Sequence, residues 1–391
     1  MMPDSSSRFH LAVALDGAGW HPAAWREADA RPADLFGADY WTDLVIEAER
    51  GALDFVTIED SLAVQSDEPY EPDDRIDRVR GRLDAVLIAA RVAPRTQRIG
   101  LVPTAVVTHT EPFHVSKAVA TLDYVSAGRA GVRVQIAGRP DVAAHFGRRE
   151  PADPQRADEY FAETVDYVEV LRRLWDSWED DAEIRDAATG RFVDRDKLHY
   201  IDFEGRWFSV KGPAITPRPP QGQPIVAALG HGRASYELIA ESTDVGFVTP
   251  SDAGDAAGIV GDIRTRQQAV GRESETLHIF GDLVVFLDDS ELAAQARRRR
   301  LDDLAGSEYR SDADVFTGTA AQLADLLQQW HAAGLTGFRL RPAALPHDLV
   351  QITEHLVPEL RRRGLFRAAY EAGTLRGLLG LPHPVNRYTV A

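Results

Sequence analysis

The chain of 391 residues contains no cysteine. This absence excludes disulfide bonds, metal sites built on thiolates and a cysteine nucleophile. An excess of positive charge is also missing, because 44 Lys and Arg stand against 61 Asp and Glu and the net charge is −17 with histidine neutral. A protein with this charge is not expected to bind a polyanion such as nucleic acid.

Long hydrophobic runs are absent as well. No stretch approaches the roughly 18 apolar residues that cross a bilayer, and the opening "MMPDSSSRF" has no basic region followed by an apolar one. The sequence therefore predicts a cytoplasmic protein without a membrane anchor or secretory signal. Hydrophobic residues make up 44% of the chain, which is ample material for a large core.

What the chain does contain is a regular alternation of apolar segments of strand length and amphipathic segments of helix length. The predicted strands lie at residues 9–16, 53–60, 98–107, 131–135, 224–229, 245–248, 277–287 and 337–342. Short connections between such segments are typical of a parallel sheet built from βαβ units. Eight of them favour an α/β fold, a closed (β/α)8 TIM barrel. The alternative is an open doubly wound sheet, whose glycine fingerprint is missing after the first strand.

Two segments fall outside this alternation. Residues 179–222 are polar and rich in turn residues, and they predict an insertion that carries a hairpin. Residues 347–391 predict a helical extension. We therefore expect a single barrel domain over residues 1–391, with these two additions.

The predicted strand at residues 131–135 has two different faces. Aliphatic side chains alternate with Arg133 and Gln135, so the aliphatic face would contact the helices and the polar face would point into the barrel. A buried guanidinium needs a partner. Either Arg133 forms an internal ion pair, with Asp60 or Asp16, or it meets a polar or anionic ligand at the barrel mouth.

Barrel enzymes place their sites at the carboxyl ends of the strands. The residues toward the carboxyl ends of predicted strands, or just after them, are Asp16, Trp20, His21, Glu59, Asp60, Thr104, His109, Arg133, Gln135, Ala137, His145, Gly230, His231 and Gly232. The turn "ALGHGRAS" opens a predicted helix, so its backbone N–H groups at residues 230–232 are candidates for holding a phosphate, although such a turn is more often only a turn.

The histidines do not form a metal motif. No HExxH occurs, and the histidines stand singly among residues that are not ligands, so no metal site is expected. A lone histidine is usually a structural or surface residue. His109 and His145 stand out only because they lie just past strand ends.

Five segments appear together in an order typical of one family. They are "YWTDLVIEAERGALDFVTIEDS", "TEPFHVSKAVATLDYVSAGRAG", "RADEYFAETVDYVEVLRRLWDSW", "GRWFSVKGPAITPRPPQGQPIV" and "LVPELRRRGLFRAAYEAGTLRGLLGLPHP". As a set they resemble the bacterial luciferase-like flavin-dependent monooxygenase superfamily, in the branch of nitrilotriacetate and dibenzothiophene sulfone monooxygenases. With the first strand included, the resemblance runs from residue 9 to the end of the chain.

The resemblance implies a two-component monooxygenase. Such a barrel takes reduced FMN from a separate flavin reductase and uses O₂ to oxygenate a small organic substrate, commonly as a homodimer or homotetramer. The implied cofactor contacts are Asp60, Thr104, Gln135, Ala137, Gly230, His231 and Gly232, and the implied catalytic residues are His109, His145 and Arg133. His231 is a further candidate for proton transfer. Residues 63–74 and 179–221 are candidate lids.

The chain departs from the family pattern at several positions near the expected flavin. Arg133 replaces an asparagine, Ile136 and Ala137 replace a threonine and a serine, Pro154 replaces a tyrosine and Gly232 replaces a serine. A guanidinium and backbone N–H groups are able to compensate for lost hydroxyls. The departures also leave two alternatives open, namely a deazaflavin-dependent oxidoreductase of the same superfamily and a non-catalytic barrel subunit that has lost flavin binding.

Overall fold

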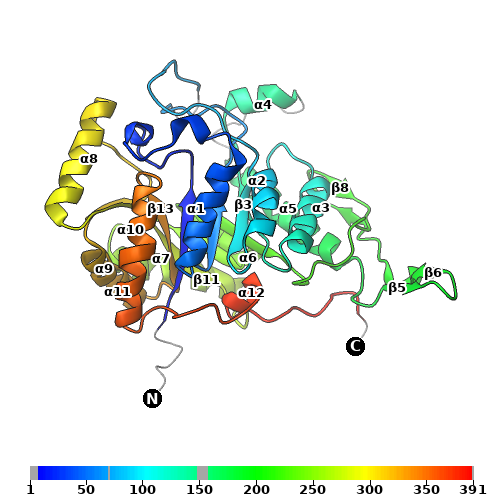
Figure 1. Ribbon diagram of the computed structural model, residues 1–391. Coiled ribbons are helices and arrows are strands. Elements are labelled where there is room, and N and C mark those ends of the chain that lie inside the picture. The colour runs from blue at the N-terminus through cyan, green and yellow to red at the C-terminus, as the bar shows by residue number, and fades with distance from the viewer. Residues whose placement is uncertain (1–7, 69–70, 148–156, 390–391) are drawn as a thin grey trace.

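The computed structural model describes residues 8–68, 71–147 and 157–389. Eight parallel strands form a closed barrel (Figure 1): β1 (His10–Leu15), β2 (Phe55–Ile58), β3 (Gly100–Val106), β4 (Gly131–Gln135), β9 (Ile225–Gly230), β10 (Val245–Val248), β11 (His278–Leu287) and β13 (Gly337–Pro342). Each strand pairs with the next in this order, and β13 pairs with β1 to close the ring. The predicted (β/α)8 barrel is confirmed.

Helices follow the strands and surround the barrel (Figure 1): α1 (Ala38–Arg50), α2 (Ala85–Val92), α3 (Pro112–Val125), α5 (Ala157–Asp176), α6 (Arg233–Ser242), α7 (Ala253–Ala269), α8 (Glu291–Ala305) and α9 (Ala320–Ala332). Their apolar faces pack on outward strand residues in one continuous core, which includes Val132 and Val134 as expected from the alternation in β4. Within the described ranges, no helix combines the length and apolar character that crossing a membrane requires.

One strand of the barrel sheet was not predicted. The strand β12 (Asp314–Gly318) pairs with the last five residues of β11, Leu283–Leu287. On that same edge the first four residues of β11 pair with β10, so β12 begins to pair after β10 has ended. The long β11 therefore leaves an edge of unpaired backbone groups, and β12 satisfies it.

The insertion carries two hairpins where one was predicted. They are β5 (Glu183–Asp186) with β6 (Arg191–Val193), and β7 (Phe203–Glu204) with β8 (Ser209–Val210). The β5–β6 hairpin lies at the side of the barrel, away from the upper end (Figure 1). The loop that follows β2 rises instead over the upper end of the barrel.

The C-terminal extension is only partly helical. A continuous helical segment comprises α10 (His347–Gln351), a π-helical turn (Ile352–Leu356) and α11 (Val357–Arg362), and a short helix α12 (Leu375–Leu378) follows. Leu375 of α12 belongs to the same cluster as Phe55, Val102 and Phe247 inside the barrel. Gly100 of β3 leaves the space for this side chain, since a Cβ there would lie 2.6 Å from Leu375 Cδ1. The helix α12 therefore closes the lower end of the barrel.

A buried acid connects this extension to the barrel. The Asp54 carboxylate is fully buried and accepts hydrogen bonds from the Leu11 N–H (2.8 Å), from His10 Nδ1 (2.9 Å) and from Arg367. Burial alone would raise the pKa of Asp54, but His10 and Arg367 outweigh burial and lower the pKa to about 2.

We expect Asp54 to make the fold sensitive to acid. Because its folded pKa of about 2 lies below the ordinary 3.8, the carboxylate stabilises the fold above pH 3.8, and this contribution disappears as the pH falls through 2. It amounts to about 2 kcal/mol. The free energy of unfolding, measured by urea denaturation at pH 5, 3 and 2, should fall less with decreasing pH in Asp54→Asn than in the unaltered protein. Equal dependence in the two proteins would contradict this assignment.

Candidate active site

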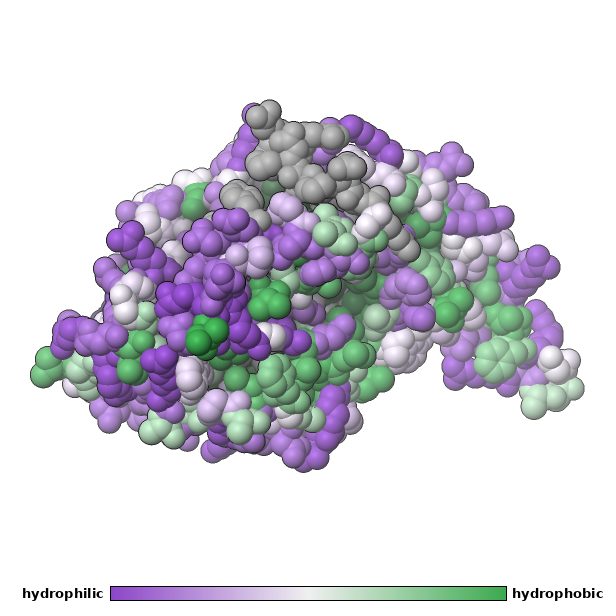
Figure 2. Space-filling view, turned by 90° about the horizontal axis from the view of Figure 1, so that it is seen from above, coloured by the Kyte–Doolittle hydropathy of each residue, from purple (hydrophilic) through white to green (hydrophobic). Residues whose placement is uncertain are grey.

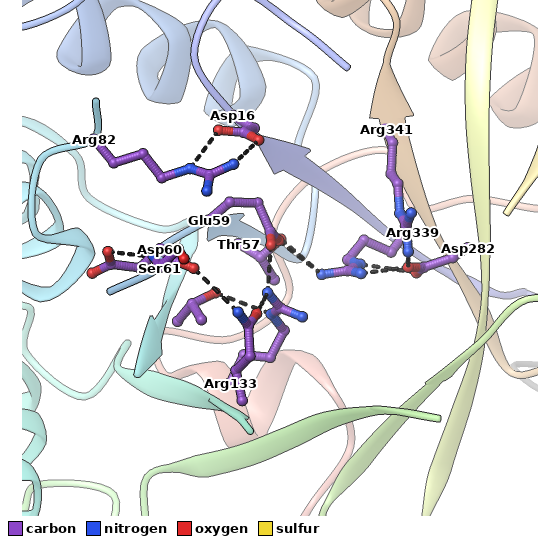
Figure 3. A network of polar contacts seen from close by, with 12 residues as sticks. Asp16, Thr57, Glu59, Asp60, Ser61, Arg82, Arg133, Asp282, Arg339 and Arg341 are labelled. Atoms are coloured by element: carbon purple, nitrogen blue, oxygen red, sulfur yellow. Dashed lines mark hydrogen bonds and ion pairs between the residues drawn. The ribbon is translucent and has the colours of Figure 1, made fainter. Parts of the chain in front are cut away.

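The inward side chains near the carboxyl ends of the strands are polar and charged. They include Thr57, Glu59, Thr104, Arg133, Gln135, Asp282, Arg339 and Arg341 (Figure 3). Toward the amino ends of the strands the interior is aromatic, with Phe55, Phe247 and Phe280 in contact with one another. The guanidinium of Arg339 lies 4.1 Å from the ring centroid of Phe247, so the charged layer rests directly on this aromatic layer.

Arg133 contacts side chains at the ends of β2, β3 and its own strand β4, although only 3% of the residue is exposed. Its Nε donates to Thr104 Oγ1 (3.0 Å), and its Nη2 donates to Gln135 Oε1 (2.6 Å) and to the Glu59 carboxylate. Burial lowers the pKa of Arg133 to about 10, which leaves it protonated at neutral pH. The internal ion pair expected for Arg133 is confirmed, but its partner is Glu59.

Neither of the two acids proposed as the partner of Arg133 has that role. Asp16 pairs with Arg82 (2.5 Å between Oδ2 and Nη2; Figure 3). The Asp60 carboxylate accepts from the N–H groups of Ser61 (2.7 Å) and Ala85 (3.0 Å), where α2 begins. The physical reason is the alternation of β2, which turns Glu59 inward and the next residue outward.

Asp60 nevertheless lies beside Arg133, since Gln135 Nε2 donates to the Asp60 carbonyl oxygen at 3.3 Å (Figure 3). Burial raises the pKa of Asp60, while the two backbone N–H groups oppose that shift. The sequence placed Asp60, Thr104, Arg133 and Gln135 at one site, and the structure brings these four residues together. Thr104 is fully buried, and its hydroxyl accepts from Arg133.

Ion pairs continue from Arg133 across the barrel. Glu59 also accepts from Arg339 (3.4 Å), which pairs with Asp282, and Asp282 accepts in turn from Arg341 (2.5 Å). Burial would raise the pKa of Asp282, but the two arginines outweigh it and lower the pKa. Alternation of sign along this chain allows several full charges to lie inside the barrel.

Arg339, Arg341 and Asp282 were not among the predicted site residues. The signal was nevertheless present, because "GFRLRP" alternates aliphatic and cationic residues as "GVRVQ" does in β4. Alternation along β13 therefore turns Arg339 and Arg341 inward, as alternation along β4 turns Arg133 inward. Asp282 lies within the apolar run of β11, where an acid predicts a buried cationic partner.

The two predicted catalytic histidines lie on one rim of the barrel. His109 follows β3 and stacks on Phe146, with ring centroids 5.2 Å apart. Phe146 ends the helix α4 (Pro140–Phe146), and the neighbouring His145 is exposed. The N–H of Ala137, after β4, donates to Thr108 Oγ1 (2.8 Å), which holds the ends of β3 and β4 together.

The glycine-rich turn after β9 has internal partners for two of its N–H groups. Those of His231 and Gly232 point to Ser235 Oγ at 3.0 and 3.2 Å, so the serine hydroxyl caps the start of α6. Gly230 is buried at the end of β9. The role of this turn in phosphate binding stays a prediction. Pro154, another predicted departure, lies outside the described residues.

A cavity of about 400 Å³ opens beside the end of β1, and we call it the mouth cavity. Its walls are residues 16–22 and 25, residues 65, 67, 78 and 79 from the loop after β2, and residues 307–310. Trp20, which the sequence places just after the first predicted strand, lines it. This end of the molecule is hollowed, with hydrophobic residues gathered around the hollow and hydrophilic residues over much of the surrounding face (Figure 2). The volume is within the range of small-molecule sites.

The loop after β1 is held in place by the backbone of β13. Trp20 N–H donates to the Pro342 carbonyl oxygen (3.0 Å), and His21 N–H donates to that of Ala343 (2.9 Å). Gly19 has φ +123°, and a Cβ there would lie 2.4 Å from the Ala343 oxygen. Only glycine allows this approach, which fixes the wall of the mouth cavity.

The fold and this site define a TIM-barrel enzyme with a charged mouth and an adjoining small-molecule cavity. Residues 18–337 match the luciferase-like monooxygenase family. The chain belongs to this family, as its resemblance predicted, and the protein is an oxidoreductase of the flavin-dependent monooxygenase class.

Individual relatives are similar over nearly the whole chain. N-acetyl-S-(2-succino)cysteine monooxygenase of Bacillus subtilis is 31% identical over 99% of this chain and 100% of the relative. Nitrilotriacetate monooxygenase component A of Aminobacter aminovorans is 29% identical, with 98% of each chain covered. The crystal structure of long-chain alkane monooxygenase has a TM-score of 0.85 at 24% identity, covers 95% of both chains and shows the same fold.

Proposed function

We propose that this protein is the oxygenating component of a two-component monooxygenase. It takes reduced FMN from a separate flavin reductase and transfers one oxygen atom of O₂ to a small organic substrate, while the other leaves as water. The observation that carries this proposal is the similarity along the whole chain to two monooxygenases, one of them named as a component A.

The polar groups beside Arg133 suit the ring of a flavin. The pyrimidine edge of the ring presents two carbonyl oxygens and an N–H group, so it needs both donors and acceptors. The Gln135 carboxamide provides both, Arg133 provides a charged donor and the backbone carbonyl of Asp60 provides an acceptor. These three residues would hold the ring, and reduced FMN would supply the electrons that activate O₂.

The protein's own contribution is to position the substrate and to exclude water. The mouth cavity offers aromatic walls next to the charged network, because Asp16 belongs to its lining and also lines a smaller neighbouring cavity together with Glu59. His109 and His145 are the groups that we propose for proton transfer.

Another histidine of the cavity has a structural role. His21 is buried, and its Nδ1 accepts from the Ala23 N–H (3.1 Å), so the neutral ring carries its proton on Nε2 and donates it to Asp302 (3.1 Å). Burial lowers the pKa of His21, although Asp302 opposes the shift. His21 therefore stays neutral and keeps this wall rigid.

We expect the purified protein to bind reduced FMN with micromolar or tighter affinity, at about 8 kcal/mol. Anaerobic titration followed by tryptophan fluorescence measures this affinity, with oxidised FMN and a deazaflavin as parallel titrations. Reduced FMN should bind at least about ten times more tightly than either, a difference of about 1.4 kcal/mol. Preference for the deazaflavin would favour the second candidate, and binding of none would contradict both.

That second candidate is a deazaflavin-dependent oxidoreductase. An F420-dependent secondary alcohol dehydrogenase shares the fold with a TM-score of 0.63 and 16% identity. The riboflavin lyase whose structure holds a modified FMN has a TM-score of 0.85 and 23% identity. The greater similarity in fold supports the FMN proposal.

A further inference from the structure

Two arginines that line the mouth cavity have donors without a partner among the described residues. The side chain of Arg78 is 10% exposed, and its Nη1 pairs with Asp67. Its Nε is buried and has no hydrogen-bond partner in the described part of the chain. Arg310 is exposed, and within the same ranges no acceptor lies in hydrogen-bond reach of it. An unsatisfied buried donor costs about 1–3 kcal/mol, and an acceptor on a ligand would offset this cost once a shift of the Arg78 side chain brings its Nε to the cavity surface.

Each of the three acids that line the cavity has its own cation, so none of them is left to pair with Arg310. The pairs are Asp16 with Arg82 (2.5 Å), Asp67 with Arg78, and Glu308 with Arg298 (3.3 Å). With these pairs formed, Arg310 is the charged residue of the cavity lining that has no partner of opposite charge among the described residues. The cavity therefore favours a ligand that carries negative charge.

The rest of the lining suits an apolar or planar body. Trp20, Trp25 and Tyr309 line the cavity together with the neutral His21. Tyr309 lies 5.2 Å from His21 between ring centroids, and burial raises the pKa of Tyr309 to about 12, so its phenol stays uncharged. Aromatic walls of this kind bind a flat or hydrocarbon group, while a few polar groups fix its orientation.

We infer that the mouth cavity binds the substrate and that this substrate is a small organic carboxylate, held by Arg78 and Arg310. The inference rests on the proposed function, which gives the cavity its position beside the flavin. The guanidinium groups recognise the carboxylate by charge-assisted hydrogen bonds, and the aromatic walls contact its organic part.

The test uses the full chain without flavin and follows its tryptophan fluorescence, to which Trp20 and Trp25 in the cavity wall contribute. Phenylacetate should bind at least about tenfold more tightly than phenylacetamide, which has the same shape without the charge. Arg310→Met and Arg78→Met should each weaken phenylacetate about tenfold and leave phenylacetamide unchanged. Arg299→Met is the matched control, since Arg299 is exposed on α8 and does not line the cavity.

Equal binding of phenylacetate and phenylacetamide to the unaltered protein would overturn the inference, and this comparison does not depend on the folding of a variant. Tighter binding of benzylphosphonate or phenylmethanesulfonate than of phenylacetate would overturn the assignment to a carboxylate. Titration of the same preparation with reduced FMN separates the two proposals. If the protein binds reduced FMN but does not prefer phenylacetate to phenylacetamide, only the inference about the substrate is wrong. If it prefers phenylacetate but does not bind reduced FMN, only the proposed function is wrong.

Discussion

Replacement of Asp282 by alanine is expected to lower the free energy of unfolding by about 3–5 kcal/mol. The carboxylate is fully buried inside the barrel and accepts from Arg339 Nε (2.8 Å) and Arg341 Nε (3.0 Å). Its loss leaves two buried guanidinium groups with fewer partners, since Arg339 retains only distant contacts to Thr57 and Glu59. This is the costly case of an ion pair broken on one side.

Urea denaturation monitored by circular dichroism measures the effect of Asp282→Ala. The matched control is Asp325→Ala, because Asp325 also pairs with an arginine, Arg363 (2.6 Å), but 63% of its side chain is exposed. Asp325→Ala should lower the free energy of unfolding by less than about 1 kcal/mol. If Asp282→Ala also lowers the free energy of unfolding by less than about 1 kcal/mol, water hydrates the two arginines in place of the carboxylate. The buried ion pairs would then not be essential to the stability of the barrel.

The second large effect is expected for Arg133→Met, which should weaken binding of reduced FMN about 10- to 100-fold. A charge-assisted hydrogen bond contributes about 1.5–3 kcal/mol, and the substitution removes the donor that Thr104, Gln135 and Glu59 share. Among the five departures from the family pattern that the sequence predicts, Arg133 is the one that adds a charge.

Arg133→Lys separates charge from geometry. Lysine keeps the positive charge but lacks the planar fork that reaches several acceptors at once, so we expect an affinity between those of the unaltered protein and of Arg133→Met. Denaturation curves of both variants show whether the barrel stays folded. If folded Arg133→Met binds reduced FMN as tightly as the unaltered protein, Arg133 supports the strand ends and does not contact the flavin.

The barrel strands were predictable because each is a short apolar run followed by an amphipathic helix, and local periodicity carries that signal. β12 was not predictable in this way. The segment Asp314–Gly318 is short and partly exposed, and it becomes a strand only because β11 extends beyond the end of β10. The pairing of β12 with β11 depends on a strand elsewhere in the chain, so the local composition of residues 314–318 does not predict it.

At the site, alternation along one strand predicted the inward direction of Arg133 but not its partner. The same rule applied to β2 turns residues 55, 57 and 59 inward and favours Glu59 over Asp60. Arg78 and Arg310 are a different case. They lie in loops without periodicity that meet only in the folded chain, so no pattern in the sequence places them on one cavity.

The order of the strands has a consequence for synthesis on the ribosome. The seam of the barrel joins β1 to β13, and its floor is closed by α12, which follows β13 in the chain. A nascent chain that has not yet delivered β13 holds an open sheet with bare edges, a form prone to pair with other chains. We therefore expect slow or stalled translation ahead of β13 to produce aggregates that the finished protein does not form.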